Sequence, residues 1–400
     1  MTVSHKLKNA LASGSMVRRM FEEGLKLKEI YGDNLIFDYS LGNPDLEPPE
    51  EFSEILLDLL QNNKPGAHGY MPNAGIFEVR EKVAHYLSRT LGAKVSPEMV
   101  IMTVGAAGAM NAALKTIVEP GDLVMVLAPF FMEYVFYADN HGASVQVVQT
   151  DSAFRPDIEK IKESLTNKTR AVIINSPNNP TGVIYSKEET AELAEVLRVK
   201  SQEFGRPIAL ISDEPYRKIV YNDVAVPSVF EAYENSVIVT SFSKDLSLAG
   251  ERIGYLCVNP RMENRDDFVA GASLANRILG FVSAPALMQR AVSRLLDVSV
   301  DVSVYKKRVD VLGQALKTIG YELSEPAGSF YLFPKSPIPD DLEFVEILKK
   351  ELILAVPGTG FSRPGHFRLS LCLDQKKIER SVEAFRSAYE KCGSPINRRS

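Results

Sequence analysis

The sequence predicts an α/β fold in which a mostly parallel sheet is covered by helices, followed by a smaller α+β unit. Short apolar runs, several rich in Val and Ile, recur between about residues 99 and 258 and are bounded by polar or turn residues. Amphipathic or polar segments lie between many of them. This alternation is typical of parallel strands whose connecting helices cover the sheet. After about residue 290 the pattern changes, which indicates a second unit.

The N-terminal elements are a charged helix over 16–31 and a segment rich in Pro and Gly, LGNPDLEPPEE, that indicates a hinge. A helix is predicted from about residue 76, because Ile76, Val79, Val83 and Leu87 recur at helical spacing. Strands are predicted for the apolar runs at 99–103, 122–128, 144–150, 170–176, 207–212, 236–241 and 253–258.

The C-terminal unit is predicted to begin with a long helical stretch over 285–319. Apolar runs at 328–334, 352–358 and 366–372 and a helix over 341–350 follow. A closing helix places four side chains on one face, those of Ile378, Val382, Phe385 and Tyr389. Because 400 residues exceed the usual domain of roughly 100–200, we expect an N-terminal arm with part of the small domain (1–48), a large domain (49–290) and a small C-terminal domain (291–400).

Composition excludes several classes of protein. The 46 basic residues are balanced by 51 acidic ones and form no block, so no nucleic-acid partner is expected. The three cysteines and five histidines lack ligand spacing, so neither a disulfide framework nor a metal site is expected. No stretch approaches the roughly 20 apolar residues of a membrane span, and no signal peptide is evident. We expect a cytoplasmic protein without membrane contact.

The most informative segment is SFSKDLSLAGERIG, which begins at Ser241 and follows an apolar run. Lys244 is therefore expected just past the end of a strand, at the edge of an α/β sheet where ligands bind. A lysine amine attacks an aldehyde only when deprotonated, and burial and a neighbouring cation both favour that state. The hydroxyls of Ser241 and Ser243, with the planar fork of Arg252, are suited to holding a phosphate.

This segment resembles the lysine signature of class I/II aminotransferases, the pyridoxal-phosphate (PLP) enzymes of fold type I in the aspartate aminotransferase superfamily. The match runs S-F-S-K and then R-I-G. Further motifs of that family follow in family order from about Leu41 to Arg368. The resemblance implies an enzyme in which Lys244 carries PLP as a Schiff base and the large domain binds the cofactor.

The resemblance also implies which residues contact the two edges of the cofactor's pyridine ring. In NSPNNPTG, Asn179 is implied to donate a hydrogen bond to the ring oxygen. In SDEPY, Asp213 is implied to pair with the protonated pyridine nitrogen, and Tyr216 to bond the ring oxygen beside Asn179. A carboxylate that keeps the ring protonated makes it a better electron sink. Phe131, the second residue after Pro129, is implied to stack on the ring.

The resemblance also places the phosphate. Residues Gly105, Ala106 and Ala107 open a helix after a predicted strand, where free backbone amides attract an anion. Many relatives have a polar side chain here, and this chain has only alanines. Tyr70, in HGYMPNAG, resembles a tyrosine that reaches the phosphate of the neighbouring subunit, which implies a homodimer with shared active sites.

On the substrate side, Arg368 resembles the arginine that binds the α-carboxylate in a bidentate way, beside Asn179, and Gly42 resembles the loop that closes over it. The small Ala107 and the apolar Ile278, Leu279 and Phe281 favour a neutral or aromatic side chain. Arg277 is either a reader of a second carboxylate or a helix-surface arginine. We therefore predict a transaminase that moves the amino group of a neutral or aromatic L-amino acid to a 2-oxo acid.

Four other interpretations compete with this prediction. A PLP-dependent carbon–sulfur β-lyase, or an aspartate-type transaminase, would start from the same lysine and the same proton removal. A PLP-binding regulator would need a DNA-binding domain, for which there is no room before residue 41. A nucleotide-binding enzyme is disfavoured because Gly105 and Gly108 lack both the GxGxxG and the GxxxxGK[ST] spacing.

Overall fold

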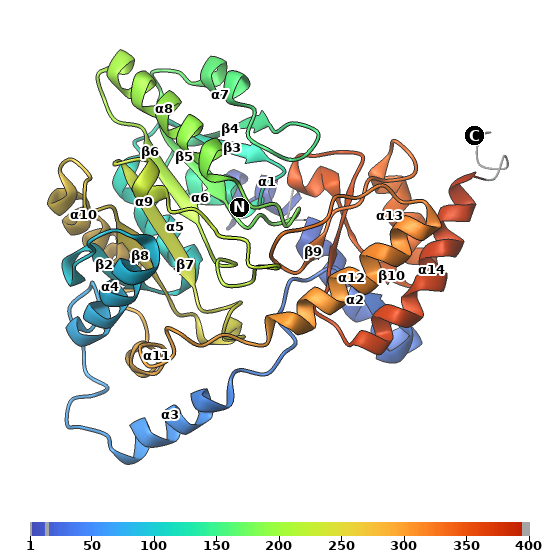
Figure 1. Cartoon of the computed structure of the whole chain (residues 1–400), viewed down its shortest axis with the longest axis horizontal. Helices are drawn as coiled ribbons and strands as arrows, with labels where there is room; N and C mark the ends of the chain where they lie inside the picture. Colours follow the sequence, from blue (N-terminus) through green and yellow to red (C-terminus); the bar gives the residue numbers. More distant parts are fainter. Residues whose placement is uncertain (1, 13–15, 394–400) are drawn as a thin grey trace.

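A seven-stranded sheet forms the centre of the larger of two lobes (Figure 1). The computed structural model describes residues 2–12 and 16–393. The strand order is β2 (Val100–Thr103), β8 (Gly254–Val258), β7 (Ser236–Ser241), β6 (Ala209–Asp213), β5 (Thr169–Asn175), β3 (Leu123–Ala128), β4 (Ser144–Gln149). All neighbours are parallel except the pairs that β8 makes with β2 and β7. The predicted α/β fold with a mostly parallel sheet is confirmed.

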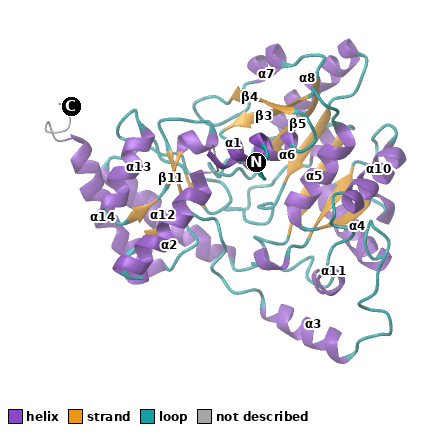
Figure 2. Cartoon of the chain, turned by 180° about the vertical axis from the view of Figure 1, so that it is seen from behind, coloured by secondary structure: helices purple, strands orange, loops and turns teal. Residues whose placement is uncertain are grey.

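Both faces of this sheet are buried, because successive side chains of a strand point to opposite faces. On β3, Val124 and Val126 join one apolar cluster, and Met125 and Leu127 join the other. Helices cover the sheet on both sides (Figure 2). The helices of this lobe are α3 (Glu50–Gln61), α4 (Phe77–Leu91), α5 (Gly105–Ile117), α6 (Glu133–Asp139), α7 (Ile158–Ser164), α8 (Lys187–Phe204), α9 (Val229–Ala232), α10 (Arg265–Ile278) and α11 (Ala286–Val292).

The smaller lobe packs around buried aromatic rings, among them Phe330, Phe344, Phe367 and Phe385. It contains an antiparallel sheet in the order β11 (Val356–Pro357), β12 (Phe367–Ser370), β9 (Tyr331–Leu332) and the parallel pair β1 (Phe37–Asp38) and β10 (Ile353–Leu354). Its helices are α2 (Met16–Tyr31), α12 (Val302–Ile319), α13 (Asp341–Lys350) and α14 (Gln375–Gly393). A first short helix, α1 (His5–Ala12), lies beside α6, where Lys6 pairs with Asp139.

The helical stretch expected over 285–319 is wrong, because the structure has two helices, α11 and α12, with a non-helical segment between them. The Lys218 ammonium donates to the carbonyls of Leu296 and Val298, at 2.7 and 3.0 Å. Asp301 then caps α12 by accepting from the amide of Ser303. Lys218, which is distant in the sequence, thus binds backbone carbonyls that would accept from backbone amides in a continuous helix. Within residues 2–12 and 16–393, no helix is long and apolar enough to cross a membrane.

Candidate active site

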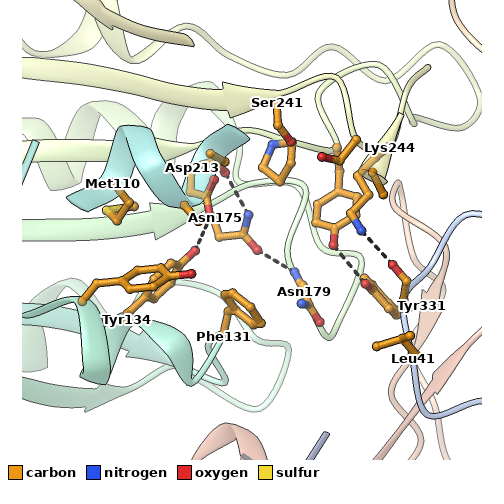
Figure 3. A pocket seen from close by; sticks show the side chains of 18 of the residues that line it. Leu41, Met110, Phe131, Tyr134, Asn175, Asn179, Asp213, Ser241, Lys244 and Tyr331 are labelled. Atoms are coloured by element: carbon orange, nitrogen blue, oxygen red, sulfur yellow. Dashed lines mark hydrogen bonds between the residues drawn. The ribbon is translucent and has the colours of Figure 1, made fainter. Parts of the chain in front are cut away.

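A cavity of about 290 Å³ opens at the carboxyl ends of the parallel strands, between the two lobes. Twelve of the fourteen predicted site residues line it, namely Gly42, Ala106, Ala107, Phe131, Asn179, Asp213, Tyr216, Ser241, Ser243, Lys244, Arg252 and Arg368. The other two do not line the cavity: Gly105 lies against the guanidinium of Arg252, and Tyr70 lies outside the cavity. Figure 3 shows Lys244, Asp213 and Asn179 converging from the ends of different strands. One edge of the sheet therefore gathers residues from across the sequence.

Lys244 stands three residues past β7, and its ammonium donates to the carbonyl of Gly42 at 2.7 Å (Figure 3). Burial is the largest cause that lowers the pKa of Lys244 to about 8; Cys372 opposes the shift, and the cations Arg368 and Arg252 add to it. Because deprotonation needs no strong base at this pKa, Lys244 is suited to nucleophilic attack and to moving protons near neutral pH.

Asp213 is the last residue of β6 and lines the cavity. One of its carboxylate oxygens accepts a hydrogen bond, and the other has no partner among the described residues. Oδ2 accepts a 2.5 Å hydrogen bond from the hydroxyl of Tyr134 (Figure 3). Oδ1 is buried and has no hydrogen-bond partner among the described residues. Burial raises the pKa of Asp213 to about 7, the Tyr134 hydrogen bond lowers it, and the Glu214 carboxylate raises it. A cationic N–H donor at Oδ1 would therefore restore the charged state.

The start of α5 forms an anion cradle with Arg252. Gly105 has φ of 68°, and a Cβ there would lie 2.9 Å from Nη2 of Arg252. Only glycine therefore allows the guanidinium to approach the first amides of the helix. Arg252 itself is left-handed, with φ of 51°, and donates to the carbonyl of Ala249 at 2.9 Å. Backbone amides, a helix N-terminus and a guanidinium together favour a phosphate.

The opposite end of the cavity holds a second cation, Arg368, in the buried strand β12. Its guanidinium donates to Oδ1 of Asn179 at 3.1 Å and to the carbonyl of Ser40. Its Nε is buried without a hydrogen-bond partner among the described residues. The ring of Tyr331 lies 4.7 Å from the guanidinium carbon. This end offers a planar cation with unused donor capacity, which suits a carboxylate.

Gly42 and Tyr331 fit together tightly at this end. A Cβ on Gly42 would collide with the Tyr331 hydroxyl, so no other residue fits there without a shift. The same hydroxyl lies 2.9 Å from that of Tyr216. Gly42 is thus held against the residues that surround Lys244.

Several predicted residues do not reach the cavity in this chain. Tyr70 is 97% exposed. Arg277 is exposed on α10, and Ile278, Leu279 and Phe281 do not line the cavity. The expectation that these last three form the side-chain pocket is wrong for a single chain, because α10 ends on the outer surface. Ala107 is the one residue of that expected pocket that lines it.

Sequence reasoning missed other residues that line the cavity: Leu41, Met110, Tyr134, Tyr137, Asn175 and Tyr331. Asn175 ends β5 as Asp213 ends β6, so the same strand-end rule could have found it. Its amide donates to the Asp213 carbonyl at 2.8 Å, and its oxygen accepts from the Asn179 amide at 2.7 Å. For Tyr331, distant from every motif, the sequence carries no signal.

The pKa of Lys244 gives a testable expectation. Competitive amine labelling of the cofactor-free chain, read by mass spectrometry, should show Lys244 reactivity rising through about pH 8. The exposed Lys187 is labelled in the same experiment as the control. A Lys244 profile that coincides with that of Lys187 would show that burial does not depress its pKa.

Fold and site together define a PLP-dependent aminotransferase of fold type I. The family pattern described as Aminotransferase class I and II matches residues 36–385, and the chain belongs to this family. It is 33% identical over 356 residues to an aspartate aminotransferase of Thermotoga maritima, covering 87% of this chain and 89% of that protein.

Two further relatives extend the comparison. An aromatic-amino-acid aminotransferase of Thermococcus litoralis is 27% identical over 398 residues, covering 96% of this chain and 97% of that protein. A crystal structure of an aminotransferase from Eubacterium rectale superposes with a TM-score of 0.95 at 36% identity, covering 98% of this chain and all of that one. The enzyme is thus a transferase that uses amino acids and 2-oxo acids.

The cavity fits PLP, the cofactor of this family. Its volume of about 290 Å³ is near the lower end of ordinary ligand pockets, roughly 300–1,000 Å³. The cradle at Gly105 and Arg252 suits the phosphate, and the unpartnered Oδ1 of Asp213 suits a ring N–H. Lys244, with its depressed pKa, suits the aldehyde.

Proposed function

We propose that Lys244 holds the cofactor and moves the proton of the substrate α-carbon during transamination. The observation that carries this proposal is the buried amine, with a pKa of about 8, between the Arg252 and Arg368 ends of one cavity. When bound, PLP supplies an electron-withdrawing ring that stabilises the electron pair left on the α-carbon. The Gly42 carbonyl accepts from the amine and orients it.

The remaining site residues orient the reactants in this proposal. Asp213 keeps the ring nitrogen protonated through Oδ1, and Tyr134 holds Oδ2 in place. Asn179 and Tyr216 face the ring oxygen, Phe131 stacks on the ring, and Arg368 binds the α-carboxylate. The phosphate is held by Ser241, Ser243 and Arg252 and by the amides at Gly105, Ala106 and Ala107. Arg368 exchanges the Ser40 carbonyl for the substrate carboxylate when the substrate arrives.

The cavity favours a neutral or aromatic amino acid as the donor, with 2-oxoglutarate or pyruvate as the acceptor. The cations that line it in the described chain are Lys244, Arg252 and Arg368, and each already has a proposed role. Leu41, Met110 and Phe131 add apolar lining. A second carboxylate buried without a cation would cost several kcal/mol. The relative named for aromatic amino acids agrees with this proposal.

Aspartate is the second candidate donor, because relatives are named aspartate aminotransferases. A donor panel measured as kcat/KM decides between the two. We expect leucine, methionine or phenylalanine to exceed aspartate. An aspartate preference of tenfold, about 1.4 kcal/mol, would contradict the apolar cavity. In that case Arg277→Ala should abolish the preference, and an unchanged preference would exclude Arg277 as the reader.

We also propose a homodimer with shared sites, which would cover exposed large side chains, among them those of Tyr70, Phe77, Leu274, Ile278 and Val282. Asn73 donates to the carbonyl of Val282 at 2.9 Å, and Asn276 to that of Asn73 at 3.1 Å, which holds the two segments together. Tyr70 is 97% exposed in one chain, and in the proposed dimer its side chain would enter the site of the second copy.

Sedimentation of the purified protein should therefore give a mass near twice 44.3 kDa. Mixing inactive Lys244→Ala chains with Tyr70→Phe chains should produce a mixed dimer in which one site has both natural residues. PLP affinity at that site should match the unsubstituted enzyme. A stable active monomer, or a mixed dimer without this recovery, would contradict the shared site.

The division into domains follows the two lobes in this proposal. Residues 49–290 form the large domain, and 1–48 with 291–400 form the arm and the small domain. The segment with Gly42 and the one between α11 and α12 connect them, so both are candidates for a hinge.

A further inference from the structure

Tyr137 lines the cavity and has no role in the function proposed above. It lies on α6 three residues after Tyr134, so the two side chains share a face of the helix. Tyr134 is bound to Asp213, at the end of the cavity assigned to the ring nitrogen. The charged groups that act on Tyr137 are Glu133 on its own helix, Asp213 and Arg252. Tyr137 is thus placed between the ring-nitrogen end and the phosphate end.

The phosphate end lacks side-chain hydroxyls at the start of α5. Ala106 and Ala107 stand at the cavity wall, and the helix has no side-chain cap at Val104. Ser241, Ser243 and Arg252 also line the cavity, and they come from β7 and the segment that follows it. A phosphate in the cradle would have acceptor oxygens available for a further donor, and a strong donor is expected where an anion is buried.

The Tyr137 hydroxyl is free to supply that donor. Among the described residues none forms a hydrogen bond with it. Burial, followed by the negative charge of Glu133 and Asp213, raises the pKa of Tyr137 well above neutral pH, so the phenol keeps its proton. A protonated hydroxyl that lines the cavity and has no hydrogen-bond partner among the described residues can donate to an anionic ligand bound there.

We propose that Tyr137 is a phosphate ligand of the cofactor, in place of the hydroxyls that Ala106 and Ala107 cannot provide. The inference rests on the proposed orientation of PLP in the cavity. It concerns binding alone, because the proton transfer proposed above is assigned to Lys244 and not to Tyr137.

The test compares two cofactors on the full-length chain by equilibrium dialysis. Tyr137→Phe should weaken PLP binding by roughly tenfold or more, the effect of one hydrogen bond to a charged group. Binding of pyridoxal, which has the same ring and aldehyde but no phosphate, should stay unchanged. Removing the hydroxyl leaves no described partner unsatisfied, so the variant is expected to fold. Adding Ala107→Ser to Tyr137→Phe should recover part of the lost PLP affinity.

Unchanged PLP binding in Tyr137→Phe would overturn the inference. Equal weakening of PLP and pyridoxal would also overturn it, because Tyr137 would then act on the ring. Failure of the unsubstituted chain to bind PLP would instead contradict the proposed site as a whole, so the two failures are distinguishable.

Discussion

Replacing Lys244 with alanine is expected to lower kcat by at least about 10⁴-fold, the upper range for the loss of a positioned proton-transfer group. The variant loses both the amine that attacks the cofactor aldehyde and the base that moves the α-proton. Steady-state transamination and the visible absorbance of the bound cofactor should both change.

Lys187→Ala is the matched control, because Lys187 is exposed and its ion pair with Glu231 is long, at 3.9 Å. Its kcat should equal that of the unsubstituted enzyme. If Lys244→Ala retains more than a few per cent of kcat, another group performs the proton transfer, and the assignment of Lys244 is wrong.

Asp213→Asn is expected to raise the barrier by about 3 kcal/mol or more, on the order of 100-fold in kcat, while cofactor stays bound. The amide cannot hold a proton on the ring nitrogen by charge, so the ring becomes a weaker electron sink. Tyr134→Phe should have a smaller effect, near tenfold, because it removes a hydrogen bond that favours the Asp213 carboxylate but leaves the carboxylate in place.

The comparison of the two variants separates charge from packing. A near-normal kcat in Asp213→Asn would show that the residue only supports the local structure. A Tyr134→Phe loss equal to that of Asp213→Asn would instead indicate that the hydroxyl, rather than the carboxylate, is the decisive group.

Most of the central sheet could be predicted from the sequence because most of its strands are continuous apolar runs between turn residues, as in 170–176 and 236–241. Such runs are buried on both faces, so their pattern is local. The break between α11 and α12 was not predictable in this way. It depends on Lys218 and Asp245, which lie more than 50 residues earlier in the chain and supply hydrogen bonds to the segment.

The residues of the candidate site also fall into those that a local sequence pattern predicts and those that depend on distant packing. Lys244, Asp213 and Asn179 follow strands, and the carboxyl edge of a parallel sheet brings such residues together. Tyr331 and Tyr134 reach the cavity only through the packing of the small lobe and of α6, which no local pattern specifies. Ile278 was misplaced because it was assigned to the substrate side from the resemblance of its segment, which does not specify packing, and its side chain is exposed in this chain.

Peptide mapping after borohydride reduction tests the central claim most directly. The purified full-length protein is reduced, digested and analysed by mass spectrometry for the pyridoxyl group. We predict that the group is on Lys244, within the peptide that carries S-F-S-K. A pyridoxyl group on any other lysine, or its absence from a protein that transaminates, would contradict the account.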